Sequence, residues 1–128
     1  MSEQVVTFRT AELAKAKDFI QPVFFYYSKG KLLNGIEGRS PLGVNYNNNQ
    51  FDEELNEDEI KEHEWFSAPT QTQLQKWLRV EHDINICIWF NELTRKYRVD
   101  QPKEINTEFF SYEDALEFAL QIGLISIK

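Results

Sequence analysis

Carboxylates are the most concentrated chemically capable side chains in this 128-residue sequence. Eight acidic residues and a single lysine, Lys61, occupy the stretch from Asp52 to Glu64, which we call the acidic window. The window accounts for the whole net charge of −7, because the basic and acidic residues outside it balance. It is either a solvated segment or a docking surface for a basic partner, including a protein that itself binds DNA. The candidate binding residues are Glu53, Glu54, Glu57, Asp58, Glu59 and Glu62.

The acidic window also contains one of the two histidines, which raises the question of a metal site. His63 follows Glu59 by four residues, so a helix would place the two side chains beside each other. Together with Glu62 they still lack the paired histidines of a recognised zinc motif. We therefore assign no metal site, no catalytic residue and no cofactor. A small hydrolase-like or metal-dependent enzyme built on these residues and His82 is kept as an alternative.

His82 and Cys87 both have a simpler structural interpretation. His82 falls at the end of a predicted helix, where a cationic ring interacts favourably with the negative helix terminus. Cys87 falls within a predicted apolar strand, where thiols are usually inert, and as the only cysteine it forms no internal disulfide. The spacing of the glycines matches neither standard nucleotide-binding motif.

A short basic stretch provides an alternative site, for nucleic acid. The patch comprises Arg95, Lys96 and Arg98, joined by Lys76, Arg79 and Trp89 if the preceding helix stacks on the strands. Positive charge combined with aromatic stacking is the usual means of holding single-stranded nucleic acid. Outward lysines and arginines also protect edge strands from aggregation, which is the simpler explanation. The chain has no basic excess, so nucleic acid is less favoured than protein as a partner.

Three helices are predicted to position these side chains. Each begins after a hydroxyl residue that can accept an unpaired amide proton of the first turn. These N-cap residues are Thr7, Thr70 and Ser111, and the helices cover residues 8–17, 71–82 and 112–121. The apolar tail up to Ile127 either prolongs the last helix or follows its end at Gly123.

Two β-hairpins complete the predicted elements. The first has a strand over residues 23–27, a turn at Gly30 and a returning strand over residues 31–33. The second has a strand over residues 84–90 and another over residues 95–100. Both of these strands alternate, and their inward residues are predicted to be Ile84, Ile86, Ile88 and Phe90, then Tyr97 and Val99.

These elements predict a single α+β domain in which short helices pack on antiparallel hairpins. Residues 1–33 would form a helix and a hairpin, residues 34–64 a long loop and the acidic window, and residues 65–128 a helix, a hairpin and a helix. A hydrophobic content of 41% suffices for one core of this size. No apolar run approaches the roughly 18 residues of a membrane span, and residues 1–20 do not resemble a signal peptide. We expect a soluble, cytoplasmic protein without a membrane partner.

Four stretches carry distinctive short motifs: VTFRTAELA at residues 6–14, SAPT followed by LQKWLR within 67–79, HDI at 82–84 and FSYEDALE at 110–117. Their order resembles that of a group of small uncharacterised proteins from bacteria and their phages or integrated elements. That group has no assigned activity, catalytic residue or cofactor, so the resemblance implies an architecture of caps and core positions. Residues 33–64 match poorly, and the resemblance implies no shared role for the acidic window.

The sequence as a whole favours a non-enzymatic protein-interaction module of phage or mobile-element origin. It would engage another protein, basic in character, through the acidic window or the long loop before it. Self-association stays open, because 18 aromatic residues are many for one small core to bury. Binding through the window should weaken with salt and disappear when Glu53, Glu54, Glu57 and Glu59 are replaced by Gln.

Overall fold

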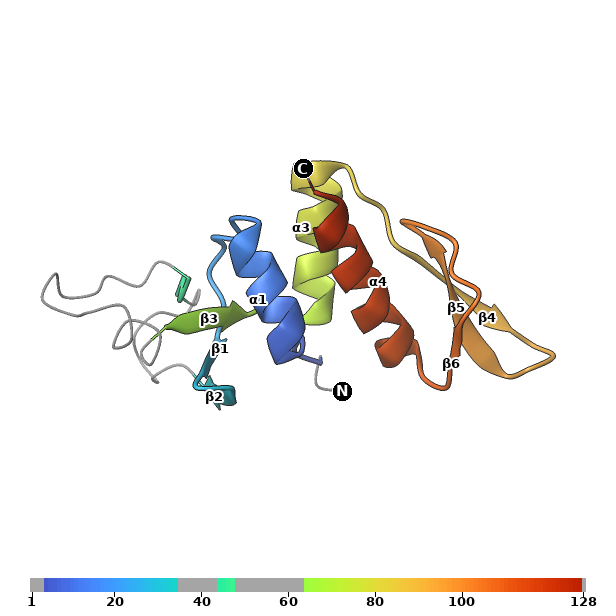
Figure 1. Cartoon of the computed structure of the whole chain (residues 1–128), viewed down its shortest axis with the longest axis horizontal. Coiled ribbons are helices and arrows are strands. Elements are labelled where there is room, and N and C mark those ends of the chain that lie inside the picture. The colour runs from blue at the N-terminus through green and yellow to red at the C-terminus, as the bar shows by residue number, and fades with distance from the viewer. Residues whose placement is uncertain (1–3, 35–43, 48–63, 128) are drawn as a thin grey trace, which may run out of the picture. The chain divides into compact units, whose positions relative to one another are not determined.

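The computed structural model describes residues 4–34, 44–47 and 64–127. Within these ranges the chain forms three helices and two antiparallel sheets of three strands each (Figure 1). The predicted α+β class is therefore confirmed. The elements are α1 (Phe8–Ala16), β1 (Phe25–Ser28), β2 (Lys31–Asn34), β3 (Trp65–Ala68), α3 (Gln71–His82), β4 (Cys87–Asn91), β5 (Lys96–Gln101), β6 (Glu108–Phe109) and α4 (Tyr112–Ser126).

A hydroxyl side chain caps the N-terminus of each helix in the described ranges. The Thr70 hydroxyl accepts a hydrogen bond from the backbone amide of Gln73 at 3.1 Å. The Ser111 hydroxyl accepts one from the amide of Asp114 at 3.0 Å, and Thr7 caps α1 in the same way. Each bond satisfies an amide that has no partner within its helix. The three helix starts predicted from sequence are confirmed.

Residues 7–69 contain one compact unit, built around α1 and the first sheet. The strand order is β2-β1-β3, and β1 pairs antiparallel with both neighbours. α1 packs on β3. The Phe8 ring meets the rings of Tyr27 and Phe66 edge-on, at centroid distances of 5.5 and 5.3 Å. The fully buried apolar residues of this unit include Ala11, Ala14 and Phe19.

The hairpin formed by β1 and β2 turns at Lys29 and Gly30. Both residues have positive φ, 54° and 77° respectively. Two successive residues in this conformation make the tight turn whose twist matches that of the flanking strands. Gly30 adopts it without steric cost, as predicted. β1 begins later than expected, because Val23 forms an isolated bridge with Val44 instead.

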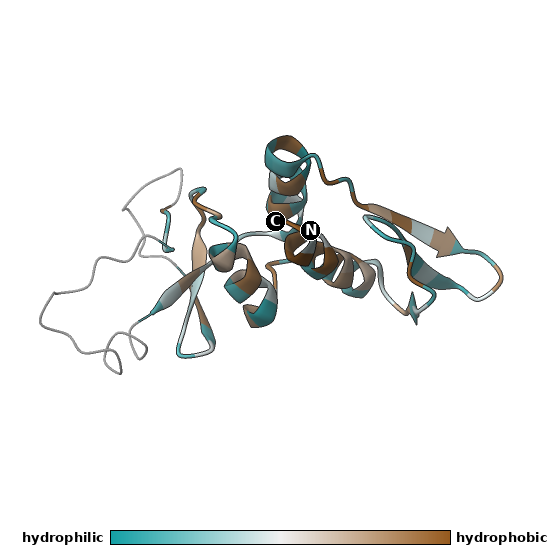
Figure 2. Ribbon diagram, turned by 45° about the horizontal axis from the view of Figure 1, so that its top comes forward, coloured by the Kyte–Doolittle hydropathy of each residue, from teal (hydrophilic) through white to brown (hydrophobic). Residues whose placement is uncertain are grey.

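The second compact unit contains residues 4–6 and 70–127 of the described chain. Its sheet has the order β4-β5-β6 and packs on α4, which also packs on α3. α4 therefore lies between α3 and the sheet (Figure 1). Figure 2 shows this helix, next to the C-terminus, as hydrophobic along most of its length. The buried cluster between α4 and the sheet consists of Val99, Ala115 and Ala119, with Ile86, Ile88, Tyr97, Ile105, Phe109 and Phe118 packed around it.

α4 continues through Gly123 to Ser126, so the apolar tail prolongs the helix. Gly123 is buried where α4 meets α3. A Cβ atom at this position would lie 3.2 Å from Cδ1 of Leu78 and 3.4 Å from Cγ2 of Ile84. The absence of a side chain thus allows the two helices to approach closely.

A buried polar contact joins the first turn of α3 to α4. The side-chain amide of Gln71 donates to the carbonyl oxygen of Glu113 at 3.0 Å and to Oε1 of Glu117 at 2.9 Å. The backbone amide of Gln71 donates to the carbonyl oxygen of Gln4 at 2.8 Å. One residue therefore connects three segments that are far apart in sequence.

Two parts of the strand prediction need correction. The strand expected from Ile84 begins at Cys87, because the Ile84 amide donates to the Leu78 carbonyl and closes the end of α3. β3 and β6 were not predicted: β3 has four residues and pairs with β1, far earlier in the sequence, and β6 has only two residues. Most of the predicted long loop, and the helical turns considered for residues 51–64, fall outside the described residues.

Candidate interaction surface

One face of the β4–β5–β6 sheet points away from α4. Side chains alternate between the two faces of a strand, so the residues that neighbour the buried ones along each strand project outward, away from α4. Trp89, Arg98 and Glu108 form one such row, paired directly across the three strands. Lys96 lies two residues before Arg98 and shares this side. We call these four residues, together with the adjoining Phe110, the outer face.

Two cation–aromatic contacts order the outer face. The guanidinium carbon of Arg98 lies 4.8 Å from the centroid of the Trp89 ring. The Lys96 ammonium lies 4.7 Å from the centroid of the Phe110 ring. Exposed contacts of this kind contribute about 0.5–1 kcal/mol each. Trp89 and Phe110 nevertheless remain 47% and 83% exposed, so both rings present a large apolar area to solvent.

The charges around the outer face are balanced. Nη2 of Arg98 lies 3.7 Å from Oε1 of Glu104. Glu108 accepts a hydrogen bond of 2.6 Å from the Thr94 hydroxyl. Residues 87–110 contain four basic and four acidic side chains in total. The outer face therefore lacks the net positive charge with which a nucleic-acid-binding protein displaces counterions from the phosphate backbone.

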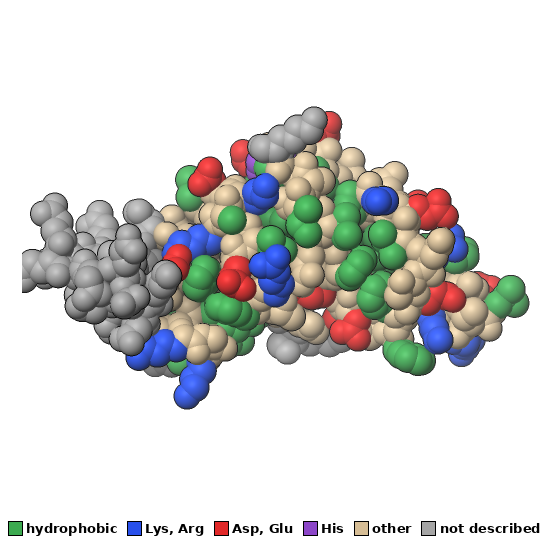
Figure 3. All heavy atoms as spheres, in the orientation of Figure 1, with side chains coloured by type: hydrophobic (Ala, Val, Ile, Leu, Met, Phe, Trp, Pro, Cys, Tyr) green, Lys and Arg blue, Asp and Glu red, His purple; other side chains and the backbone are tan. Residues whose placement is uncertain are grey.

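The β4–β5 hairpin extends the exposed apolar area beyond the strands. Leu93, in the turn, is 95% exposed. Phe90 was predicted to face inward; it lies in β4 on the side of Ile88, opposite the outer face, and contacts Tyr97, but it is 41% exposed because it is near the end of the hairpin. Figure 3 shows hydrophobic side chains reaching the surface beside Lys and Arg side chains over this hairpin, at the right of the view. Apolar side chains gathered in one place on a surface indicate an interaction site more strongly than scattered ones.

The structure brings together only part of the predicted basic patch. Lys96 and Arg98 lie on the outer face, whereas Arg95 occupies the preceding turn with a φ of 61°. Lys76 and Arg79 belong to α3, which α4 separates from the sheet. The condition for their joining the patch, that this helix stacks on the strands, is not met, because the apolar residues of the sheet pack on α4 instead.

Phe110 is the exposed aromatic residue of the outer face that sequence reasoning missed. It directly follows β6, in which Glu108 faces outward and Phe109 packs inward against Phe118. The same alternation turns Phe110 outward. A two-residue strand is too short for its alternation to be recognised from sequence, so no local signal identified this position.

The prediction that Cys87 lies within an apolar strand is wrong. Cys87 is exposed at the first residue of β4, not enclosed in an apolar strand. The strand begins three residues later than predicted, and alternation turns this side chain outward. His82 is the last residue of α3, as predicted, and its ring packs edge-on against Trp77 with the centroids 4.6 Å apart.

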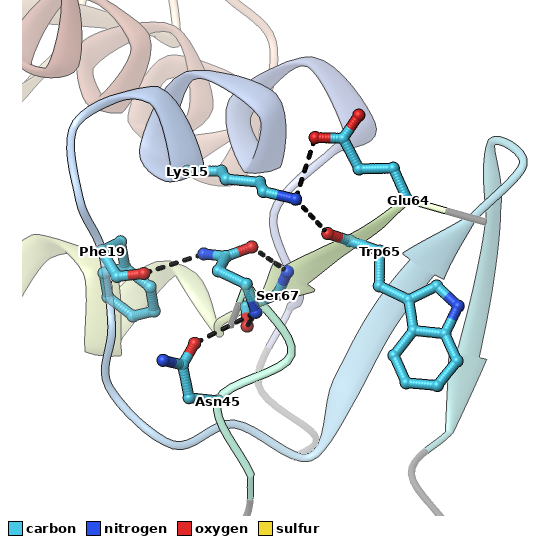
Figure 4. Close-up of polar contacts among 7 residues, drawn as sticks. Lys15, Phe19, Asn45, Glu64, Trp65 and Ser67 are labelled. Carbon is cyan, nitrogen blue, oxygen red and sulfur yellow. Dashed lines mark hydrogen bonds and ion pairs between the residues drawn. The ribbon is translucent and has the colours of Figure 1, made fainter. Parts of the chain in front are cut away.

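Only Glu64, the last residue of the acidic window, is described. Its Oε1 forms an ion pair of 2.9 Å with the Lys15 ammonium, which also donates to the carbonyl oxygen of Trp65 at 2.9 Å (Figure 4). α1 therefore neutralises the carboxylate at this end of the window. His63 and the six candidate binding residues lie outside the described residues: Glu53, Glu54, Glu57, Asp58, Glu59 and Glu62.

A polar network next to this ion pair holds residues 44–47 against β3 (Figure 4). The Asn47 side chain donates to the carbonyl oxygen of Phe19 at 2.8 Å and accepts from the Ser67 amide at 2.7 Å. The Ser67 hydroxyl oxygen accepts from the amides of Asn47 and Tyr46. Because these bonds fasten backbone segments together, we assign the network a structural role.

In the described parts of the chain, no group of three or more His, Cys, Asp or Glu side chains is placed to hold a metal ion. Among the same residues, no helix has the length and apolar character required to cross a bilayer. No protein-family model, curated protein or solved structure matches this chain. The resemblance to small bacterial and phage proteins stays a prediction.

Proposed function

We propose that this chain is a non-enzymatic protein-interaction module that binds another protein through the outer face. The observation that supports this most is the exposure of two large aromatic rings, Trp89 and Phe110, on a sheet whose other face is buried against a helix. Tryptophan, phenylalanine and arginine are enriched where proteins meet, and a few such residues supply most of the binding energy.

The cation–aromatic contacts prepare these rings for binding. Arg98 restricts Trp89, and Lys96 restricts Phe110, before any partner arrives. Ordering a side chain on association costs about 0.5–1.5 kcal/mol, and a side chain that is already held loses less. The rings therefore combine large contact area with a reduced entropic penalty.

The balanced charge favours protein over nucleic acid as the partner. Arg98 is already paired with Glu104, and Glu108 lies next to Arg98 on the neighbouring strand. A phosphate backbone would meet these carboxylates as well as the cations, which opposes binding. A protein surface with apolar side chains flanked by charges of both signs complements the outer face better.

Affinity capture with paired variants tests the proposal. The tagged chain, Trp89→Ala, Phe110→Ala and the double variant are used to capture a protein from cells that produce the chain natively. We expect each single change to reduce retention about tenfold or more, as truncation of a central interface aromatic does. Val80→Ala is the matched control, because Val80 is 64% exposed but lies on α3.

The same experiment distinguishes binding through the outer face from binding of nucleic acid and from binding through the acidic window. Full retention by the double variant would contradict binding through the outer face. Retention that nuclease digestion abolishes, or a mobility shift of a single-stranded oligonucleotide at low salt, would favour nucleic acid. Loss confined to the variant with Glu53, Glu54, Glu57 and Glu59 replaced by Gln would assign binding to the acidic window instead.

A further inference from the structure

A pocket of about 590 Å³ lies near the C-terminal ends of α3 and α4. Its lining comes from the connection between α3 and β4, from residues at the end of β5, and from the last turns of α4. The volume falls within the range of about 300–1,000 Å³ found for small-molecule sites. Phe110 precedes the opposite end of α4, so the pocket is distinct from the outer face.

The pocket has an apolar floor and a polar rim. Ile84, Pro102 and Ile122 line it and are half-buried, whereas Asp83 and Lys103 line it and are exposed. Small-molecule sites commonly combine an apolar surface with a few polar groups that fix the orientation of the ligand. The rest of the polar rim consists of Asn85, Gln101 and Ser126.

The rim carries opposite charges on different segments. Asp83 ends α3 in a left-handed conformation with φ 55°, and its carboxylate adds to the negative potential of that helix terminus. The last turn of α4, which also borders the pocket, contains no basic residue. Lys103, from the segment after β5, provides the one positive charge among the lining residues.

We propose that this pocket binds a short apolar peptide with free termini, of about dipeptide size. The ligand ammonium would lie toward Asp83 and the helix ends, the carboxylate toward Lys103, and the side chains on the floor made by Ile84, Pro102 and Ile122. The amide groups of Asn85 and Gln101 can both donate to and accept from a peptide bond. This inference is independent of the proposed function, because no outer-face residue takes part in it.

Titration of the full ¹⁵N-labelled chain with L-leucyl-L-leucine, followed by amide chemical shifts, tests the proposal. We expect perturbations confined to residues 83–85, 101–103 and 122–126. N-acetylation of the dipeptide or amidation of its carboxylate each removes one charge and should weaken binding about tenfold, as loss of a charge-assisted hydrogen bond does. Glycylglycine keeps both charges but lacks the apolar side chains, so it should bind far more weakly.

Two variants of the chain test whether Asp83 and Lys103 recognise the termini of the ligand. Asp83→Asn keeps a residue that tolerates the left-handed conformation, and Lys103→Gln changes an exposed side chain, so both should fold normally. Each should weaken L-leucyl-L-leucine binding about tenfold and remove the preference over the matching neutralised analogue. Lys76→Gln and Asp100→Asn are exposed controls outside the pocket lining and should bind like the unmodified chain.

Several results would overturn the proposal. These are an absence of shifts at millimolar dipeptide, shifts centred outside the lining segments, or equal binding of the zwitterionic and neutralised peptides. Equal binding of glycylglycine would show that the apolar floor takes no part. Unchanged affinity in both Asp83→Asn and Lys103→Gln would show that the rim charges do not recognise the termini.

Discussion

Gln71 shows how much of this structure depends on single polar side chains. Its amide group donates to Glu113 and Glu117 on α4, and its backbone amide donates to Gln4. Both Gln71 and Glu117 are buried, so the bond between them replaces water that neither group can reach. The sequence places Gln71 only one residue after a helix cap, where glutamine is ordinarily exposed. Its partners lie more than 40 positions away, so no local pattern predicted this contact.

Gln71→Leu removes both side-chain bonds and leaves the buried Glu117 carboxylate without this donor. We expect the free energy of unfolding to fall by about 1–3 kcal/mol, the usual effect of removing one partner of a buried polar pair. Urea denaturation followed by circular dichroism measures this change. Gln75→Leu, on the same helix and only half-buried, should change stability by less than about 0.5 kcal/mol. A loss in Gln71→Leu no larger than in this control would contradict the role assigned to Gln71.

The helices and hairpins differ in how well the sequence predicts them. The three caps, the Lys29–Gly30 turn and the alternation of β5 follow from residues close together in the chain, and all were predicted. β3 has four residues and pairs with β1, far earlier in the sequence, so its stability does not come from local contacts. β6 pairs with the preceding strand β5, but its two residues are too few for a recognisable alternation. The outer face was predictable in part. Alternation placed Trp89 opposite the inward isoleucines, but the choice of α4 as the covering helix depends on tertiary contacts.

The N-cap hydrogen bonds predict how much stability is lost when a capping side chain is removed. Thr70→Ala and Ser111→Ala each remove the acceptor of a first-turn amide, so each should lower the free energy of unfolding by about 1 kcal/mol. The corresponding glycine variants should lose only a few tenths of a kcal/mol. Thr72→Ala is the control, because Thr72 is exposed within α3 and alanine favours helix. Equal losses at positions 70 and 72 would show that capping is not the cause.

The close contact between α3 and α4 leads to a further prediction about stability. Gly123→Val would add side-chain atoms where a Cβ alone already lies 3.2 Å from Leu78. We expect a loss of about 1–3 kcal/mol from overpacking, measured by thermal or urea unfolding. Ile125→Val places the same side chain at an exposed position of the same helix and should stay within about 0.5 kcal/mol of the unmodified chain. A Gly123→Val variant of unchanged stability would rule out close packing at this point.

The whole molecule is one small α+β domain made of two compact units, each with its own antiparallel sheet. In sequence, residues 7–69 are inserted between two parts of the other unit, because residues 4–6 belong with residues 70–127. The isolated bridge between Val5 and Thr70, and the burial of Val6, account for this arrangement. Composition and spacing predicted the α+β class but not this connection, since a single bridge has no periodic signature.

The central claim is that the outer face binds another protein, and site-specific photo-crosslinking tests it most directly. A photo-reactive benzoylphenylalanine is introduced in place of Phe110, which is 83% exposed, or in place of Val80 as the control. The chains are expressed in the native cells and irradiated. We predict a covalent adduct with another protein from position 110 and none from position 80. No adduct at position 110, or the same adducts from both positions, would contradict the claim.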